Sequence, residues 1–279
     1  MAQLEAILTP SELPALAKRD LRDAACVVFD VLRATSAFVI ALHHGAMAVV
    51  PVSEIAEAMA IRKRQPDVLL GGERDGLRIC AAQTGGIDFD LGNSPREYTP
   101  EKVRGKIIVS TTTNGTRALR ACAGAKAVLA ASFLNLTATA ELLEKLRPAQ
   151  VVLVCAGTRE NAALEDVLAA GALCEMLLHA PLYPPKRGEA VRRAGLRRAE
   201  VAPATQAGEE FLQMSDSAGI ARRVYAQAKS DLLATVRTSE NARRLLAIPD
   251  LRDDVPFCLQ RDICPLIAKM EADGSLHAR

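Results

Sequence analysis

Val27-Val28-Phe29-Asp30 is an apolar run that ends in a carboxylate, and two later apolar runs also end in chemically reactive or polar residues. Ile107-Ile108-Val109 leads into Ser110-Thr111-Thr112-Thr113-Asn114-Gly115-Thr116, and Val151-Val152-Leu153-Val154 leads into Cys155-Ala156-Gly157-Thr158. Short branched runs of this kind are typical of parallel strands that helices cover on both faces. In such sheets, ligands bind beyond the carboxyl ends of the strands. We therefore expect a carboxylate, a hydroxyl-rich turn and a thiol to meet at one site.

Helix-like segments alternate with apolar runs along the chain. Helices are expected at 34–44, 53–65, 116–123, 135–146 and 164–178, and further strands at 48–52, 68–70 and 126–131. This alternation predicts an α/β protein, a three-layer α/β/α fold with a largely parallel or mixed sheet. We expect a single compact domain over residues 1–279, with a two-lobed form as the alternative.

Two segments do not follow this alternation. Residues 75–98 are rich in glycine and polar side chains, and a loop of this length in a compact domain is usually functional or disordered. Residues 184–198 contain two prolines, one lysine and five arginines. We interpret this basic stretch as a surface loop or insertion, with a phosphate-binding arm as the alternative.

The overall composition argues against several classes of protein. A net charge of +2 and an aromatic content of 3% do not fit a nucleic-acid-binding protein. No apolar stretch is long enough to span a bilayer, and Met1-Ala2-Gln3-Leu4-Glu5 lacks the features of a signal peptide. The 7 cysteines contain no C-x-x-C pair and fit reduced thiols. We expect a cytoplasmic protein without a membrane or nucleic-acid partner, with a homodimer as the default assembly.

Asp30 and the hydroxyl-rich turn are the strongest candidates for chemistry. Asp30 could bind a metal ion, act as a nucleophile or cap the following helix, whose free N–H groups favour an anion. Arg33 follows it closely. Residues 111–116 open a second helix with hydroxyls and backbone amides that suit a phosphate, although the spacing and lysine of a Walker A loop are absent.

Further carboxylates and one cysteine lie at loops or helix starts. The carboxylates are Glu73, Asp90, Glu165 and Asp166. Near phosphate-binding groups, such hard oxygen ligands favour Mg²⁺, which takes one or two carboxylates together with waters and substrate oxygens. One of Glu165 and Asp166 is expected only to complement the helix dipole. Cys155 could be a nucleophile if a helix N-terminus lowers its pKa, or simply a small buried apolar residue.

Several motifs together resemble the 2-phosphosulfolactate phosphatase (ComB-type) family, in the same order over nearly the whole chain. The matching segments are Asp30-Val31-Leu32-Arg33-Ala34-Thr35-Ser36, Gly71-Gly72-Glu73-Arg74, Phe89-Asp90-Leu91-Gly92-Asn93-Ser94-Pro95, residues 111–119, Cys155-Ala156-Gly157-Thr158, Leu164-Glu165-Asp166, Ser215-Asp216-Ser217-Ala218, Ser239-Glu240-Asn241 and Val255-Pro256 with Cys258 and Asp262. Departures from the family pattern are Asp88, the long polar segment 77–86 and the basic stretch at 186–198.

The resemblance implies Mg²⁺-dependent hydrolysis of the phosphate ester of a 2-hydroxy acid. The family substrate, 2-phosphosulfolactate, carries a phosphate, a carboxylate and a sulfonate, and its product sulfolactate lies on a route to coenzyme M in methanogens. These anions would pair with arginines on or near the motifs, namely Arg33, Arg74, Arg117 and Arg159. The residues implied are Asp30, Arg33 and Cys155 for catalysis; Ser36, Arg74, Asn93, Ser94, Thr112, Thr113, Asn114, Gly115, Thr116, Arg117 and Gly157 for substrate binding; and Asp30, Glu73 and Asp166 for the metal.

Two residues or a water molecule could attack the phosphate, and two other classes of protein would fit parts of the sequence. Water, Asp30 as a transient aspartyl phosphate, and Cys155 are candidates for the attacking group, although Cys155 lacks the C-x₅-R loop of thiol phosphatases. A haloacid-dehalogenase-like phosphatase would need a second aspartate where this chain has Leu32. A non-catalytic protein that binds a phosphorylated metabolite would use the same arginines and threonines.

Overall fold

The computed structural model describes residues 2–179 and 212–279, so the basic stretch expected at 184–198 lies outside the described residues. The strands are β1 (Ala2–Ile7), β2 (Ala24–Phe29), β3 (Ala48–Pro51), β4 (Leu69–Arg74), β5 (Leu77–Arg78), β6 (Ile107–Thr111), β7 (Ala127–Ala131), β8 (Gln150–Cys155), β9 (Leu212–Met214), β10 (Ala268–Met270) and β11 (Leu276–Ala278). The α-helices are α1 (Leu13–Leu16), α2 (Ala34–His43), α3 (Ile55–Arg64), α4 (Ala81–Thr84), α5 (Pro100–Val103), α6 (Gly115–Ala121), α7 (Leu136–Leu146), α8 (Leu164–His179), α11 (Asp216–Ala228), α12 (Leu232–Val236), α13 (Glu240–Leu246) and α14 (Asp254–Cys258). Three 3₁₀ turns are η1 (Pro10–Glu12), η2 (Pro95–Glu97) and η3 (Phe133–Asn135).

The described strands form one sheet in the order β5-β4-β6-β3-β11-β10-β7-β2-β8-β1-β9. Its two parallel blocks are β4-β6-β3 and β7-β2-β8-β1-β9. The hairpin β10–β11 joins them, and its pairings with β7, within itself and with β3 are all antiparallel. Three reversals in succession mean that β3, β4 and β6 run opposite to β2, β7 and β8.

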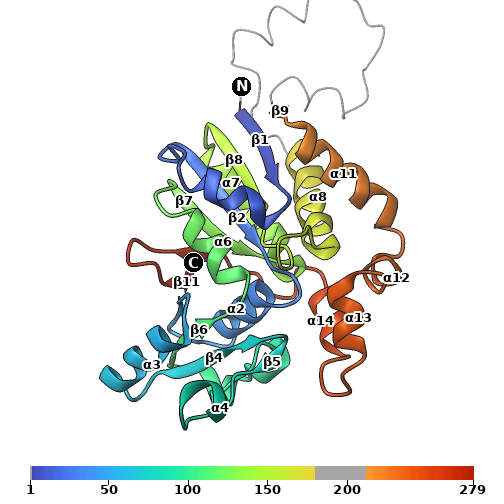
Figure 1. The fold of residues 1–279 in the computed structure, drawn as a ribbon. Coiled ribbons are helices and arrows are strands. Elements are labelled where there is room, and N and C mark those ends of the chain that lie inside the picture. Colours follow the sequence, from blue (N-terminus) through green and yellow to red (C-terminus); the bar gives the residue numbers. More distant parts are fainter. Residues whose placement is uncertain (1, 180–211) are drawn as a thin grey trace, which may run out of the picture.

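Because the two parallel blocks run in opposite directions, their strand ends do not all lie at one edge of a single parallel sheet, as the sequence predicts they would. The ends of β2 and β8 lie at one edge of their shared block, as expected, but the end of β6 belongs to the other block. In Figure 1 the two blocks occupy the upper and lower halves of the molecule, with α2 near their junction and α13 and α14 beside it. The polar tips of both blocks therefore face a common region between them.

Helices cover both faces of the upper block. Ala25, Val27 and Phe29 of β2 pack into one apolar cluster with α7, α8 and α11, while Cys26 and Val28 face a second cluster with α1, α2 and α6. A third, smaller cluster lies between β4, β6 and α3. The two-faced burial of β2 explains its unbroken apolar run. The predicted three-layer α/β fold with a mixed, largely parallel sheet is confirmed.

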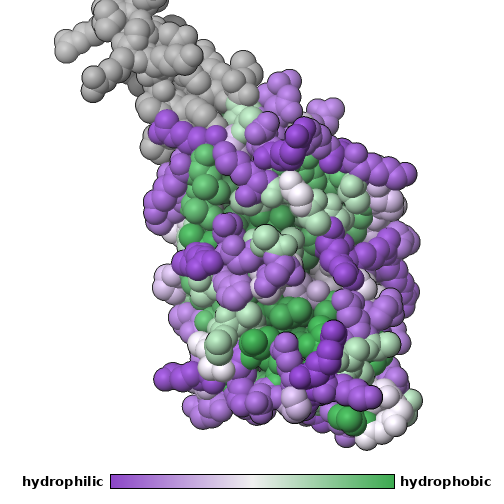
Figure 2. All heavy atoms as spheres, turned by 90° about the vertical axis from the view of Figure 1, so that its left-hand side faces the viewer, coloured by the Kyte–Doolittle hydropathy of each residue, from purple (hydrophilic) through white to green (hydrophobic). Residues whose placement is uncertain are grey.

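The molecular surface is mixed in polarity. Figure 2 shows one face, on which apolar areas are interrupted by hydrophilic side chains. The large apolar side chains that are most exposed in the described part lie on separate segments: Met47, Leu77, Ile87, Ile220 and Ile263. Within residues 2–179 and 212–279, no helix has the length and apolar character needed to cross a bilayer.

Candidate active site

A polar pocket lies between the two parallel blocks. Its walls come from the ends of β2, β4, β6 and β8, from the loop before η2 and from α13 (Figure 1). The residues that line it are Asp30, Leu32, Arg33, Glu73, Asp75, Gly76, Asn93, Thr113, Asn114, Thr158, Arg159, Asn241, Arg244 and Leu245. All three polar strand tips that the sequence singles out thus contribute to one pocket.

Asp30 follows β2 directly and is almost completely buried. Its Oδ1 accepts a hydrogen bond from the Ala34 amide at 3.1 Å, at the start of α2. Burial, together with the negative charges of Glu73 and Glu165, raises the pKa of Asp30 to about 7. Within the described chain, Oδ2 accepts no hydrogen bond. Asp30 therefore presents one oxygen without a hydrogen-bond donor, in surroundings that disfavour its negative charge.

The turn between β6 and α6 packs directly on Asp30. A Cβ atom on Gly115 would lie 2.7 Å from Asp30 Oδ2, so this position requires glycine for close approach rather than for its backbone angles. Thr112 and Thr116 bond to each other: the Thr116 hydroxyl donates to the Thr112 carbonyl at 2.9 Å. These two threonines fix the helix start, whereas Thr113 and Asn114 line the pocket.

Glu73 at the end of β4 clamps this turn. Its Oε1 accepts from both the amide and the hydroxyl of Thr113 at 2.9 Å, and its Oε2 accepts from the Gly76 amide at 2.7 Å. Both carboxylate oxygens are therefore engaged by protein donors. Glu73 lines the pocket, as the metal prediction requires, but it also holds the turn between β6 and α6 in place.

Asp166 and Glu165, neighbours at the start of α8, differ sharply in their surroundings. Asp166 accepts from the Val31 amide at 2.8 Å and from the Gly157 amide at 3.0 Å, so it ties together the loops after β2 and β8. Burial and the charge of Asp30 raise the pKa of Asp166 well above its usual range. It does not line the pocket.

Glu165 is the carboxylate with an unsatisfied oxygen. Its Oε1 accepts from Asn241 Nδ2 at 2.7 Å, whereas its Oε2 is buried without a hydrogen-bond partner among the described residues. The same Asn241 amide lies 2.5 Å from Thr158 Oγ1. A buried carboxylate oxygen without a partner is costly unless a cation or donor from outside the chain meets it.

Arg33, Arg159 and Arg244 form the cationic part of the pocket. The Nε of Arg244 is buried without a partner, and its Nη2 donates to Asn241 Oδ1 at 3.1 Å. No carboxylate in the described part of the chain pairs with Arg244. Sequence reasoning placed Arg159 near the site but missed Arg244, three residues after the quoted Ser239-Glu240-Asn241 motif. That helical spacing is the one local signal that could have found it.

Two other predicted arginines lie outside the pocket lining. Arg74 donates to the Glu73 carbonyl at 2.7 Å and to Thr111 Oγ1 at 3.0 Å, and it supports the ends of β4 and β6. Arg117 is exposed and pairs with Glu160 at 3.0 Å. Both lie next to the motifs in sequence, but their side chains bind protein groups.

The remaining predicted residues divide into lining and supporting positions. Asn93 lines the pocket, and its Oδ1 is buried without a partner in the described part. The hydroxyl of Ser36 donates to the Val31 carbonyl at 2.8 Å. Gly157 has a left-handed φ of 68° and lies against Pro10 and Asn161, where a Cβ would collide. These contacts make Ser36 and Gly157 supports of the loop geometry.

Cys155, the last residue of β8, is buried in the apolar cluster beneath α8 and does not line the pocket. Burial and the nearby Asp166 carboxylate raise the pKa of the Cys155 thiol well above its usual range. A thiolate nucleophile needs the opposite environment, with a lowered pKa and access to the substrate. The geometry gives Cys155 the character of a small apolar core residue.

Asp30, which lines the pocket, and Glu165, which bonds to the lining residue Asn241, have the donor chemistry that suits a magnesium ion. Asp30 Oδ2 and Glu165 Oε2 are carboxylate oxygens without a hydrogen-bond donor in the described part, and burial together with nearby acidic side chains raises the pKa of Asp30 and of Asp166. Residues 2–179 and 212–279 contain no group of three or more His, Cys, Asp or Glu side chains arranged to hold a metal. Mg²⁺ commonly binds through one or two carboxylates and completes its shell with waters and substrate oxygens.

Known proteins that are similar to this chain support the family resemblance over most of its length. A family model described as 2-phosphosulpholactate phosphatase matches residues 8–273. A probable 2-phosphosulfolactate phosphatase of Thermotoga petrophila is 38% identical over 237 residues, 85% of each chain. A protein of the same name from Parasynechococcus marenigrum is 34% identical over 271 residues, 96% of each chain. One from Caldanaerobacter subterraneus subsp. tengcongensis is 46% identical over 161 residues, 57% of this chain and 64% of that protein.

Proposed function

Because the chain belongs to the 2-phosphosulpholactate phosphatase family, a family of phosphoric monoester hydrolases, we propose that it hydrolyses 2-phosphosulfolactate to sulfolactate and phosphate in a Mg²⁺-dependent reaction. The observation that carries the metal part of the proposal is the pair of carboxylates with unsatisfied oxygens, Asp30 and Glu165. The observation that supports an anionic substrate is the cationic part of the same pocket, formed by Arg33, Arg159 and Arg244.

In this proposal, Asp30 and Glu165 hold the magnesium ion. Asn241 orients Glu165 through a 2.7 Å hydrogen bond, and Gly115 allows the turn after β6 to pack against Asp30. Bound Mg²⁺ would neutralise charge on the phosphoryl oxygens and align the phosphate with the attacking group. Glu73 and Asp166 serve as supports, because protein donors already occupy both oxygens of each carboxylate.

The other side chains of the pocket bind the anionic groups of the substrate. Arg33 neutralises the phosphoryl oxygens, and Asn114, whose side chain has no hydrogen-bond partner in the described chain, donates to them. Arg159 and Arg244 receive the carboxylate and the sulfonate, since planar guanidinium groups bind such anions through paired hydrogen bonds. Asp30 is a metal ligand in this scheme, so water is the attacking group.

The decisive experiment measures phosphate release from 2-phosphosulfolactate by purified protein, first after chelation of metals and then after addition of Mg²⁺. We expect release only with the metal. Turnover that survives complete chelation would contradict the metal part of the proposal. Absence of release from this ester and from phospholactate by folded, Mg²⁺-loaded protein would favour a non-catalytic metabolite-binding protein.

A matched pair of variants tests the ligand assignment. Glu165→Gln should lower kcat/KM by about 10²-fold or more and raise the Mg²⁺ concentration needed for half-maximal activity. Glu160→Gln changes an exposed acid whose ion pair among the described residues is with Arg117, and it should behave as wild type. Mass spectrometry of quenched reactions should detect no phosphorylated protein. A phosphoryl group on Asp30 would identify that carboxylate as the nucleophile instead.

A further inference from the structure

Arg33 and Asp254 form an ion pair that is buried at the edge of the pocket. The Nη1 of Arg33 lies 2.8 Å from Asp254 Oδ2, and the side chains are 3% and 0% exposed. The two residues are 221 positions apart in sequence, so the pair forms only when α14 docks onto the start of α2. Asp254 belongs to neither the pocket lining nor any motif quoted from the sequence.

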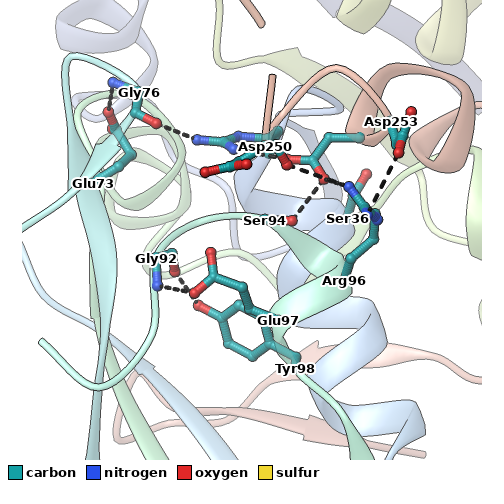
Figure 3. Close-up of polar contacts among 12 residues, drawn as sticks. Ser36, Glu73, Gly76, Gly92, Ser94, Arg96, Glu97, Tyr98, Asp250 and Asp253 are labelled. Atoms are coloured by element: carbon teal, nitrogen blue, oxygen red, sulfur yellow. Dashed lines mark hydrogen bonds and ion pairs between the residues drawn. The ribbon is translucent and has the colours of Figure 1, made fainter. Parts of the chain in front are cut away.

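The pair is part of a continuous polar network, which Figure 3 shows from Glu73 and Gly76 across to Ser94, Arg96 and Asp253. The second amino group of Arg33 donates to the Gly76 carbonyl at 2.6 Å. The other oxygen of Asp254 accepts from the Ser94 hydroxyl at 2.6 Å. Arg33 is thus held by two acceptors from different segments, and its anchoring carboxylate is held in turn.

A second cavity beside the pocket would leave the Arg33 side chain free to move if Asp254 did not hold it. A second cavity of about 390 Å³ lies between η2 and the segment after α13, and Arg33 and Asn93 line both spaces. An arginine side chain has several rotatable bonds, and fixing it in one orientation costs conformational entropy. Without an acceptor on its far side, the guanidinium would have space to turn away from the pocket. The Asp254 carboxylate removes that freedom.

A buried ion pair is weak evidence for stability, because desolvation of both charges offsets their attraction. Its best-supported effect is to fix geometry, and here the group that it fixes lines the candidate active site. Two of the five N–H donors of Arg33 are bound by Asp254 and Gly76, which leaves the others for an anion. We propose that Asp254 is a positioning residue that orients Arg33 toward the phosphoryl oxygens during catalysis. The inference rests on the proposed phosphatase function and deepens it.

Asp254→Asn tests the inference with little change in shape. The amide oxygen can still accept from Arg33, and the amide nitrogen can still donate to Ser94, so the main loss is the charge, which also pairs with Arg96 at 3.6 Å. We expect kcat for 2-phosphosulfolactate to fall by about 10²-fold, as for a misplaced catalytic group, with KM changed less than about threefold. The matched control is Asp253→Asn, an adjacent acid that is 67% exposed and lies 3.6 Å from Arg96. This control should retain wild-type kinetics.

A double-mutant cycle separates positioning from a general effect on folding. If Asp254 acts through Arg33, then Asp254→Asn should have little further effect on kcat in an Arg33→Lys background, because the losses are not additive. Independent losses that multiply, or wild-type kinetics of Asp254→Asn, would overturn the inference. Ser94→Ala keeps both charges and should lower kcat several-fold, and it decides the case if Asp254→Asn does not fold. Failure of the wild-type protein to release phosphate would instead contradict the proposed function.

Discussion

Replacing Asp30 by asparagine is expected to stabilise the metal-free protein while it abolishes activity. The carboxyl is buried close to Glu73 and Glu165, and these surroundings raise its pKa from 3.8 to about 7. Asparagine has nearly the same shape and keeps an acceptor for the Ala34 amide, which donates to Asp30 at 3.1 Å. The substitution therefore removes the cost of a buried charge with little loss of contacts.

The sign and size of the effect follow from proton linkage. Between about pH 4 and pH 7, the unfolded chain has lost the proton of Asp30 while the folded protein retains it, so stability falls as the pH rises. Above pH 7 the folded state carries the full cost, which is about 4 kcal/mol for a pKa raised from 3.8 to about 7. At pH 4.5 the cost is only about 1 kcal/mol. Asp30→Asn should thus stabilise strongly at pH 8 and weakly at pH 4.5.

Urea unfolding of both proteins in chelator, at pH 4.5 and pH 8, measures this difference. Asp23→Asn, a change at an exposed aspartate just before β2, is the matched control and should have no effect at either pH. Mg²⁺ in large excess over its dissociation constant should stabilise wild type by roughly 3 kcal/mol and leave Asp30→Asn unchanged. A stability gain independent of pH, or a loss at pH 8, would refute the electrostatic account of Asp30.

Three further substitutions test the pocket. Gly115→Ala should lower kcat by about 10²-fold, because its Cβ would lie 2.7 Å from Asp30 Oδ2, the oxygen proposed to bind Mg²⁺. Gly219→Ala on α11, where a Cβ would only reach Met214 at an ordinary contact distance of 3.9 Å, should be neutral in the same steady-state assay. Arg244→Gln should raise KM for 2-phosphosulfolactate about tenfold more than for phospholactate, while Arg243→Gln should leave that ratio unchanged; equal effects on both esters would contradict a sulfonate contact. Cys155→Ala should retain kcat within about threefold and lose stability by about 1–2 kcal/mol in urea unfolding, and loss of all activity in a folded protein would restore the thiol to the mechanism.

The local features of the fold and site could be predicted because they depend on short segments. The apolar runs at β2, β6 and β8 and the polar turns after them are explicit in the sequence. The opposed directions of the two strand blocks could not be predicted in this way. They depend on β10 and β11, whose short strands with mixed burial carry no clear period of their own. The family predicted from the motifs is confirmed by the match over residues 8–273.

The choice between neighbouring side chains needed the structure. Glu165 and Asp166 are consecutive on a helix, where successive side chains point about 100° apart, and sequence alone does not say which one bonds to the lining residue Asn241. Arg74 and Arg117 lie within the motifs but bind protein groups. Arg244 and Asp254 reach the pocket region from α13 and α14, so their roles depend on long-range docking that local patterns do not encode.

The antiparallel hairpin β10–β11 has a consequence for biosynthesis. Among the described strands, it is the link through which the sheet joins its two parallel blocks, and it comes last in the sequence. During translation, the strands that carry Asp30 and Glu73 leave the ribosome long before the hairpin that unites their blocks. Each block can pair its own strands early, but the junction between them closes only after residue 278 has been synthesised. The nascent chain therefore passes through a period in which Asp30 and Glu73 have both been synthesised but the sheet that connects their blocks is not yet continuous.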